Sequence, residues 1–340
     1  MSTNGSTTSE GAQTRTSIHA AGIGSVLGRS PAMRATFDLI QRVAGTEATV
    51  LITGESGVGK ELVAELIHEL SPRNDGPMVA INCGSIPATL IEAELFGYEK
   101  GSFTGATRSH AGVFERANGG TLLLDEITEM PMEMQTRLLR VLETGRFFRV
   151  GGTEEIKTDI RVIAATNRDM NDAVRERQLR EDVMYRLAVF PIHVPPLRVR
   201  ESDIRLLAEN FLERLNREAG SAKVFSEGSL RTLGEHSWPG NVRELKNAVE
   251  RAFIMADTVL ELAPVLVARG VDAADADHMQ GIHVPLGSRL DEAERSLIVA
   301  TLEHFDGNKR RAAQVLGCSL KTLYNKLNAY ARETAWARQG

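Results

Sequence analysis

This sequence contains little cysteine, no long apolar run and no excess of basic residues. Each of these features excludes a class of protein. Only Cys83 and Cys318 occur in 340 residues, far apart and without ligand-like neighbours, so neither a disulfide framework nor a zinc site is expected. No apolar run approaches the roughly 18 residues that span a bilayer. Residues 1–17 are rich in Ser, Thr and Gly and lack the apolar segment of a signal peptide. We therefore expect a cytoplasmic protein without a membrane partner.

The charge balance also limits the kind of nucleic-acid binding that is possible. A formal net charge of −5 argues against a uniformly basic surface, although it is compatible with a local basic patch. Charged residues make up 25% and hydrophobic residues 42%, which is typical of globular proteins. A chain of 340 residues is long enough for two or three domains with a sizeable core.

Short apolar runs alternate with helical patterns in the first part of the chain. The predicted strands are 48–53, 78–82, 121–124, 160–166 and 190–194. Helices are predicted between them at 62–70 and 134–142. This alternation indicates an α/β fold, in which helices cover both faces of a parallel sheet.

Strand patterns stop near residue 202, and the remaining chain is helical or weakly patterned. Helical spacing at 203–217, 227–236 and 241–256 predicts a small helical domain. Residues 263–288, with Gly, Pro and acidic residues, are typical of a linker. Helical spacing returns at 290–330 and predicts a separate all-α unit.

A glycine-rich segment directly follows the first predicted strand and opens a helix, which is the context that a phosphate-binding loop requires. The glycines let backbone N–H groups surround phosphates, Lys60 can reach the outer phosphates, and the helix N-terminus favours negative charge. Glu61 stands where such loops usually carry the Ser or Thr that binds Mg²⁺. A chance glycine-rich turn is the competing interpretation. We assign nucleotide binding to Gly54, Glu55, Ser56, Gly57, Val58, Gly59, Lys60 and Glu61.

Two adjacent acids end the predicted strand that begins at residue 121. Asp125 is placed to hold Mg²⁺, directly or through water, and Glu126 to polarise the attacking water. Such a pair is often only a solvated strand end. Together with the upstream phosphate loop, however, it indicates an ATPase that uses ATP and Mg²⁺.

Three further polar residues are candidates for the same site. Asn167 ends the next strand, where it can sense the γ-phosphate or orient water. Arg180 and Arg186 are six positions apart on a helix and do not share one face, so they are not expected to act as one local pair. They can instead reach the phosphate of a neighbouring subunit as arginine fingers, and surface salt bridges are the alternative.

A Trp-Pro-Gly turn precedes the last helix of the small helical domain. Asn241 is expected to cap this helix. Arg243 lies in its first turn, where a basic residue opposes the helix dipole. Arg243 is therefore expected to face an anion, and we assign it to nucleotide binding.

A second glycine-rich segment lies between the phosphate loop and the acid pair. Gly97, Gly101 and Gly105 recur every fourth residue, so a long helix is not expected to continue through this segment. Phe103 and Thr104 lie among these glycines, where burial is not expected. Without further context the segment predicts a mobile surface turn.

Six segments, in this order, resemble the motifs of one family: GESGVGKE, GYEKGSFTGA, GGTLLLDE, ATNRD, LREDVMYRL and WPGNVREL. Together they are similar to the central domain of sigma-54-dependent transcriptional activators, which are bacterial enhancer-binding proteins of the AAA+ class. The resemblance covers roughly residues 26–263. The combination is highly specific, whereas a phosphate loop alone is not. Glu61 is itself normal in this family.

The resemblance implies an AAA+ P-loop parallel sheet with a helical lid, working in a ring that is commonly a hexamer with ATP at the subunit interfaces. Arg180 and Arg186 would act in trans in such a ring. Asn82 would be the switch residue that restrains Glu126 until the nucleotide state changes. Residues 149–153 would form a second, supporting loop. The glycine-rich loop would contact sigma-54 through Gly101, Ser102, Phe103, Thr104, Gly105 and Ala106, with Ser102 in place of the family's commonest Ala.

Residues 307–327 have helix-turn-helix spacing and a local excess of basic residues. The buried face of the first helix is predicted to be Ala312, Ala313, Val315 and Leu316. Gly317 permits the turn, and Ser319 can cap the second helix. DNA contacts are expected from Lys309, Arg310, Arg311, Ser319, Lys321, Thr322, Tyr324, Asn325 and Lys326.

This segment resembles the Fis-type helix-turn-helix that ends sigma-54 activators. The helix at 290–304 is expected to dimerise, which implies an enhancer site with two-fold symmetry. A helical dimerisation hairpin without DNA binding is the competing interpretation, and the basic excess argues against it.

The resulting hypothesis is an ATP-driven activator that binds enhancer DNA and remodels the sigma-54 RNA polymerase closed complex. An AAA+ unfoldase subunit is one alternative, but it would lack a DNA-reading helix. A repressor with an inactive ATPase is another, and the intact Lys60, Asp125 and Glu126 argue against it. The predicted domains are a disordered tail (1–25), the AAA+ α/β subdomain (26–200), the AAA+ helical lid (201–262), a linker (263–288), the helix-turn-helix domain (289–331) and a tail (332–340).

Regulation is expected to act in trans. Only about 25 residues precede the predicted ATPase, which is too few for a folded sensor such as the receiver of two-component-like activators. We therefore expect control by an inhibitory partner, by a related co-activator or by expression level.

Overall fold

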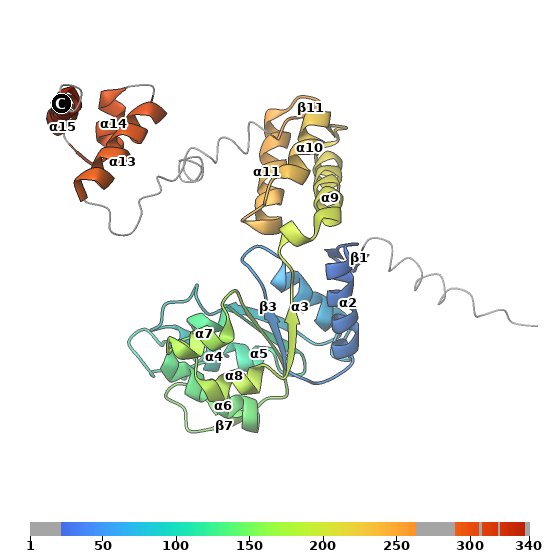
Figure 1. Cartoon of the computed structure of the whole chain (residues 1–340). Coiled ribbons are helices and arrows are strands. Elements are labelled where there is room, and N and C mark those ends of the chain that lie inside the picture. Colours follow the sequence, from blue (N-terminus) through green and yellow to red (C-terminus); the bar gives the residue numbers. More distant parts are fainter. Residues whose placement is uncertain (1–21, 263–289, 306–307, 319, 337–340) are drawn as a thin grey trace, which may run out of the picture. The chain divides into compact units, whose positions relative to one another are not determined.

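The computed structural model describes residues 22–262, 290–305, 308–318 and 320–336 (Figure 1). The chain divides into two compact units, 1–265 and 266–340, and each is described by itself. In the described residues, no helix is both long enough and apolar enough to cross a membrane.

The first unit is built on a five-stranded parallel sheet with the order β4-β5-β8-β3-β9. Its strands are β3 (Val50–Thr53), β4 (Met78–Asn82), β5 (Thr121–Asp125), β8 (Arg161–Thr166) and β9 (Phe190–His193). Neighbouring strands are paired in parallel throughout, with Asn82 opposite Asp125. All five predicted strands, and the α/β class, are therefore confirmed.

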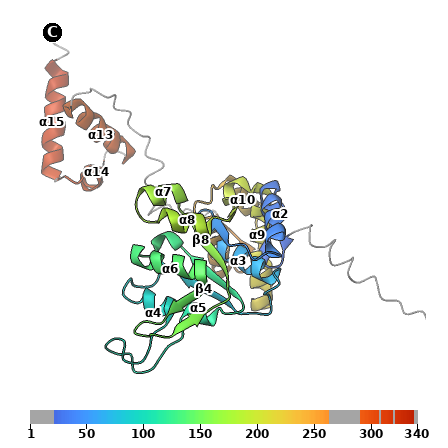
Figure 2. The same cartoon turned by 90° about the horizontal axis from the view of Figure 1, so that it is seen from below.

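Helices cover both faces of the sheet, as the apolar strands require (Figure 2). Strand side chains alternate, so Ile52 and Ile163 pack toward one face, while Leu124 and Val162 pack toward the other. One face is covered by α2 (Pro31–Ala44) and α3 (Lys60–Glu69). The other is covered by α4 (Ile91–Phe96), α5 (Val113–Arg116), α6 (Met132–Thr144), α7 (Met170–Arg175) and α8 (Glu181–Leu187).

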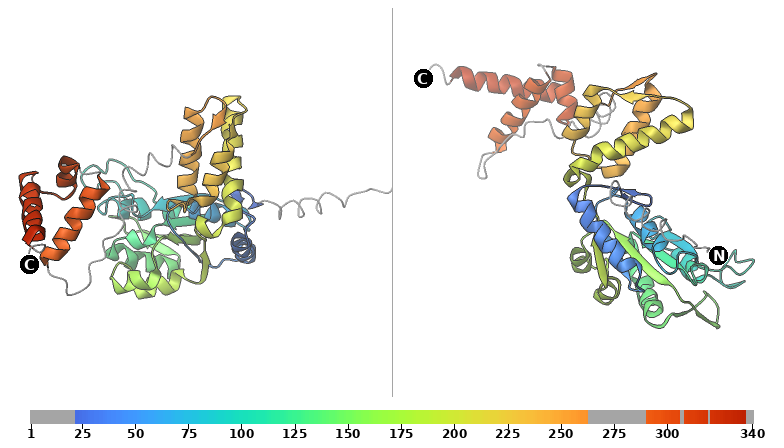
Figure 3. Two further views of the ribbon diagram at one scale, coloured as in Figure 1. Left: turned by 45° about the horizontal axis from the view of Figure 1, so that its top comes forward. Right: turned by 90° about the vertical axis from the view of Figure 1, so that its right-hand side faces the viewer.

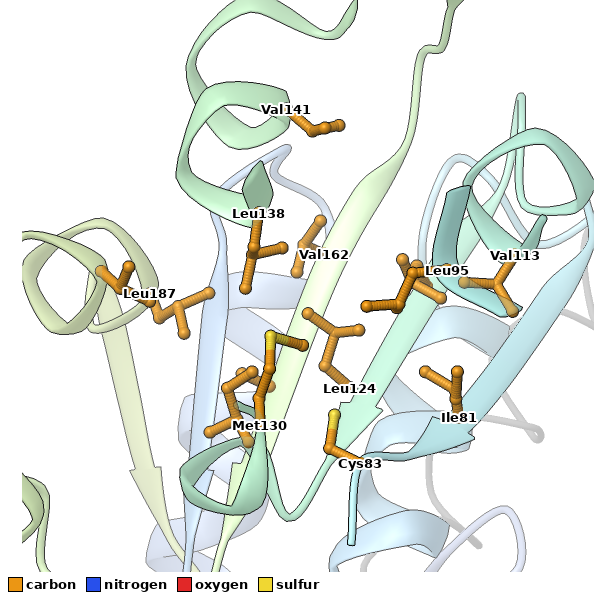
Figure 4. Close-up of a cluster of buried hydrophobic side chains, with 14 of the residues drawn as sticks. Ile81, Cys83, Leu95, Val113, Leu124, Met130, Leu138, Val141, Val162 and Leu187 are labelled. Atoms are coloured by element: carbon orange, nitrogen blue, oxygen red, sulfur yellow. The ribbon is translucent and has the colours of Figure 1, made fainter. Parts of the chain in front are cut away.

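Figure 4 shows part of the apolar cluster on the face covered by α4 to α8, where Leu138 of α6 lies close to Val162 of β8. Both side chains are almost fully buried. Burial of one such side chain stabilises the fold by about 1.5–3 kcal/mol. This packing holds the sheet rigid, so that polar residues at its strand ends keep fixed positions.

The remaining part of the first unit is a helical lid (Figure 3). It consists of α9 (Glu201–Ala219), α10 (Glu227–Glu235) and α11 (Asn241–Met255), with a small parallel pair, β10 (Val224–Phe225) and β11 (Val259–Leu260). The three predicted helices are confirmed. Trp238 before α11 is fully buried, and its indole N–H donates to the carbonyl of Leu233.

Several short elements are absent from the sequence prediction. They are β1 (Gly22–Ile23), β2 (Val26–Leu27), the antiparallel pair β6 (Arg146–Phe148) and β7 (Glu155–Lys157), and the 3₁₀ turns η1 (Ile127–Glu129) and η2 (Leu197–Val199). The long helix α2 is also unpredicted. Ser30 caps α2 by accepting the N–H of Met33, and Pro31 occupies its first position, so local signals for this helix are present in the sequence.

The second unit contains α13 (Leu290–His304), α14 (Lys309–Val315) and α15 (Leu320–Trp336). Its core joins Ile298, Ala312, Ala313 and Leu323, with Leu316 packed against it. Gly317 has φ +64°, as a left-handed turn residue requires. Val315 is wrong as a predicted core residue, because it is 54% exposed. At about 100° per residue it lies outside the arc formed by Ala312, Ala313 and Leu316.

Candidate functional site

The predicted phosphate loop runs from the end of β3 to the start of α3, and glycine is required at two of its positions. Gly54 has φ +152°, and a Cβ there would lie 2.6 Å from the carbonyl oxygen of Val194. Gly57 has φ +80°, and a Cβ would lie 2.5 Å from the carbonyl oxygen of Gly240. The loop is therefore held against both the sheet and the lid.

Lys60 is the first residue of α3 and is almost fully buried. Its Nζ donates to the carbonyls of Gly54 (3.0 Å) and Glu55 (3.4 Å) and lies 3.9 Å from Oε1 of Glu126. Burial lowers the pKa of Lys60, although the negative charges of Glu126 and Asp125 oppose this effect. The ammonium group thus lies between the loop and the acid pair, where a phosphate group can compete for it.

The acid pair lies at the carboxyl end of β5, next to Asn82 on β4. The Asn82 amide donates to Oδ2 of Asp125 at 3.0 Å, and its oxygen accepts the N–H groups of Gly84 and Ser85. These bonds fix the orientation of the amide. Asn82 therefore holds Asp125 in this structure, and its restraint of Glu126 stays a prediction.

Glu126 follows in a left-handed conformation, with φ 50° and ψ 50°. This conformation costs a non-glycine residue about 1–2 kcal/mol. It directs the carboxylate toward the end of β8, where Oε2 accepts the backbone N–H of Asn167 at 3.4 Å. The structure thus brings Lys60, Asp125, Glu126 and Asn167 together at one edge of the sheet.

The lid also contacts the phosphate loop. Nη1 of Arg243 donates to Oγ of Ser56 at 3.0 Å, and its backbone N–H donates to the carbonyl of Gly57 at 3.2 Å. The prediction that Asn241 caps α11 is wrong. Gly240 precedes the helix, no side chain caps it, and the Asn241 amide is already bonded to other groups.

Arg180 directly precedes α8, Arg186 lies in its last turn, and the two have separate partners, consistent with the prediction that they do not act as one pair. Arg180 pairs with Asp182 through two bonds of 3.0 and 2.8 Å. Arg186 donates to the carbonyl of Leu142. Both are surface contacts on their own subunit, so the action of these arginines in trans stays a prediction.

The loop at 101–106 is closed at its base and open at its tip. Tyr98 exchanges two backbone hydrogen bonds with His110 at the base. At the tip, Phe103 is 43% exposed, and its ring meets the ring of Tyr98 edge-on at 4.9 Å. Thr104 is exposed, whereas Ala106 is buried. Tyr98 was not predicted as a partner of Phe103, although it lies within the same motif.

The second predicted loop, 149–153, supports the first. Arg149 donates to Glu115 (2.8 and 2.6 Å) and to Glu99 (2.8 Å). A Cβ at Gly151 would lie 2.7 Å from the Cβ of Ser102, so the two loops touch. The sequence signal for the ion cluster was weak, because its members are 34 and 50 positions apart.

Apart from Ser319, the predicted DNA-contacting residues lie on α14 and α15. Lys321, Thr322 and Asn325 are exposed, and Tyr324 is 45% exposed beneath the ammonium of Lys309. Lys326 pairs with Glu294 at 2.6 Å, and the guanidinium of Arg311 lies over the ring of Phe305. The side chains of Arg310 and Ser319 lie outside the described part of the chain.

Three protein families match consecutive parts of the chain. Residues 26–193 match the sigma-54 interaction domain, and residues 198–274 match the AAA+ ATPase lid domain. Residues 289–330 match the Fis family of bacterial regulatory proteins.

Several named proteins are similar to this chain over most of its length. The DNA-binding transcriptional regulator NtrC of Azospirillum brasilense is 44% identical over 329 residues, which cover 89% of this chain and 68% of NtrC. The Nif-specific regulatory protein of Azotobacter vinelandii is 45% identical over 304 residues, covering 88% of this chain and 57% of that protein. The crystal structure of NtrX from Brucella abortus in complex with ATP has a TM-score of 0.66 and 34% identity, covering 94% of this chain and 72% of NtrX.

Proposed function

The chain belongs to the family of sigma-54-dependent transcriptional activators, and from that premise we propose how its residues carry out the activity. The chain binds DNA, hydrolyses ATP and activates transcription with sigma-54. One observation supports the proposed residue roles above all. Lys60 and Glu126 lie 3.9 Å apart, beside Asp125, at the edge of the sheet that the phosphate loop closes.

Nucleotide binding uses the loop and the lid together. Lys60 and the backbone N–H groups of the loop bind the phosphates, and Arg243 binds them from the lid. Asp125 would hold Mg²⁺, which supplies positive charge against the phosphate oxygens. A carboxylate suits this ion, which takes its other ligands from phosphates and water.

Hydrolysis depends on Glu126 as the proton acceptor for the attacking water, with Asn167 orienting that water. Arg180 and Arg186 act on the ATP of a neighbouring subunit in a hexameric ring, assembled in the cytoplasm from dimers. Their exposure and their weak surface partners support this role. Arg180→Ala should lower kcat at least tenfold while ATP still binds, and an unchanged kcat would argue against action in trans.

Remodelling depends on the loop at 101–106, which carries Phe103 and Thr104 to sigma-54 as the nucleotide state changes. The test compares two activities of one protein. Thr104→Ala and Phe103→Ala should keep at least about half of the ATP hydrolysis rate, because neither residue contacts the site, yet they should lose open-complex formation at a sigma-54 promoter. Open complexes at wild-type level in both variants would show that the loop is only a surface turn.

Enhancer binding uses α15, whose exposed Lys321, Thr322 and Asn325 would read base edges in the major groove. In a gel-shift assay, the wild-type chain should retard enhancer DNA fragments, and the double variant Asn325→Ala with Lys321→Ala should not.

Regulation in trans, by an inhibitor or a related co-activator, is also part of the proposed function.

A further inference from the structure

One buried side chain of the lid bonds both the phosphate loop and the segment that leads into the lid. The Asn241 oxygen accepts the N–H of Leu197 at 2.8 Å. Its amide nitrogen donates to Oε2 of Glu55 and to the carbonyl of Ser56, each at 3.1 Å. We propose that Asn241 is a positioning residue that ties the lid to the phosphate loop through Glu55 and thereby sets the affinity for ATP. This inference rests on the ATPase function proposed above.

The chemistry of this position suits asparagine. The backbone has φ +53°, a left-handed conformation that asparagine tolerates better than most residues. The side chain is fully buried, so each of its polar groups needs a partner. One end must accept from an N–H while the other donates to a carboxylate and a carbonyl. Aspartate would place negative charge against both acceptors, and an apolar residue would leave them without this donor.

Glu55 is held from a second direction as well. Arg198 of η2 forms two bonds with its carboxylate, at 2.8 and 2.6 Å. The hydrogen bonds from Arg198 and then from Asn241 lower the pKa of Glu55 below its ordinary value, because both stabilise its carboxylate. A residue of the phosphate loop is thus tied both to the segment entering the lid and to the start of α11.

The next two loop residues also contact the start of α11. The carbonyl of Gly57 accepts the N–H of Arg243, and Oγ of Ser56 accepts from the Arg243 guanidinium. Any change in the shape of the phosphate loop on phosphate binding therefore alters its contacts with the first residues of α11. Both ends of the Asn241 amide are already bonded to Leu197, Glu55 and Ser56, so its effect on ATP is exerted through the shape of the loop.

The test is Asn241→Asp in the full chain, assayed by steady-state ATP hydrolysis and by binding of a fluorescent ATP analogue. The lost hydrogen bond to a charged group, with repulsion in its place, should raise KM and the analogue's Kd by about tenfold or more. The change in kcat should be within about threefold, because the acid pair is untouched. Equal KM values for the variant and the wild type would overturn the proposal.

Two comparisons separate positioning from a general loss of stability. Asn216→Asp makes the same change at a lid amide that bonds Ser221 and Lys223, and it should lower Tm without raising KM. In the double variant Asn241→Asp with Glu55→Gln, the amide of the new glutamine can donate to the carboxylate of the new aspartate. KM should therefore fall at least about threefold from that of the single variant Asn241→Asp. A KM increase in Asn216→Asp equal to that in Asn241→Asp, or no recovery in the double variant, would contradict the proposal.

A surface variant covers the case in which Asn241→Asp does not fold. Arg198 is half exposed, so Arg198→Ala should keep the fold while it releases one tie on Glu55. Its KM should rise about threefold or more, and an unchanged KM would overturn the proposal. Absence of ATP hydrolysis in the wild-type chain would instead reject the ATPase function itself.

Discussion

The two glycine-rich loops of the ATPase unit use glycine for opposite purposes. In the phosphate loop, a Cβ at Gly57 would lie 2.5 Å from a lid carbonyl. In the loop at 101–106, Gly101 and Gly105 also have positive φ, but no atom lies within 4 Å of the position of a Cβ. Glycine makes room for a close neighbour in the first loop and only permits an unusual backbone in the second.

This difference shows how binding and movement are divided within one unit. The phosphate loop is enclosed by the sheet and the lid, so its N–H groups are positioned before ATP arrives. The other loop is attached at its base, through Tyr98 and His110, and its tip is exposed. A fixed loop suits recognition of phosphates, whereas a loop with an exposed tip can change position with the nucleotide state.

The largest expected effect removes the chemistry of the enclosed site and leaves its shape. Glu126→Gln keeps the size of the side chain but removes the proton acceptor. ATP hydrolysis should fall by about 10²–10⁴-fold, measured as phosphate release, while the fluorescent ATP analogue still binds. Thr104→Ala, at the open loop, is the control. A hydrolysis rate in Glu126→Gln within a few fold of wild type would show that another group accepts the proton.

The comparison can be tested directly with one substitution in each loop. Gly57→Ala adds a methyl group against the Gly240 carbonyl at positive φ, and should lower the free energy of unfolding by about 2–3 kcal/mol and weaken ATP binding. Gly105→Ala has the same backbone problem without the contact, and its neighbours can relax. Urea unfolding of both variants measures the difference, and equal losses would remove the contrast.

A smaller effect should sharpen the description of the open loop. The edge-on contact of Tyr98 with Phe103 contributes about 0.5–1.5 kcal/mol beyond its buried area. Tyr98→Leu should therefore speed amide hydrogen exchange of residues 101–106 by a few fold. Tyr185→Leu changes an exposed tyrosine on α8 and should leave this exchange unchanged. If amide exchange of residues 101–106 is unchanged in Tyr98→Leu, contacts other than the Tyr98 ring restrain this loop.

The smallest expected effect is the pH dependence of stability that Lys60 of the phosphate loop contributes in the absence of nucleotide. The pKa of Lys60 is lowered in the folded chain from its ordinary value of 10.5, chiefly by burial. Between these two pKa values the unfolded chain binds more protons, so the contribution of Lys60 to stability rises with pH. Relative to Lys60→Ala, the wild type should gain stability as pH rises toward 10.5, measured by urea unfolding. An opposite slope would mean that the acid pair raises this pKa.

Local patterns were enough to predict the elements that are long or strongly apolar. The five strands of the sheet, the three lid helices and the α14–α15 turn all appear where apolar spacing indicates them. The short helices α4, α5 and α7 were missed, because fewer than eight residues give too little periodicity to recognise. Val315 was placed wrongly because its apolar character did not show that it falls outside the packed arc.

The same limit applies to the site. The order of motifs predicted a nucleotide loop and a sigma-54 loop, and the structure brings Lys60, Asp125 and Glu126 together as expected. The sequence pattern suggested a helix cap at Asn241, because asparagine before a helix commonly caps it. Its actual partners lie 44 and 186 positions away, where no local pattern reaches.

The sequence alone therefore determined the family, the fold class and the candidate residues for the chemistry, because these depend on spacing within short segments. Only the tertiary structure decided which buried polar groups bond to one another. Asn82 bonds Asp125 because β4 and β5 lie side by side in register. Asn241 bonds Glu55 because the lid folds back onto the phosphate loop. A buried polar group takes the partner that the packing provides, and packing is a property of the whole chain.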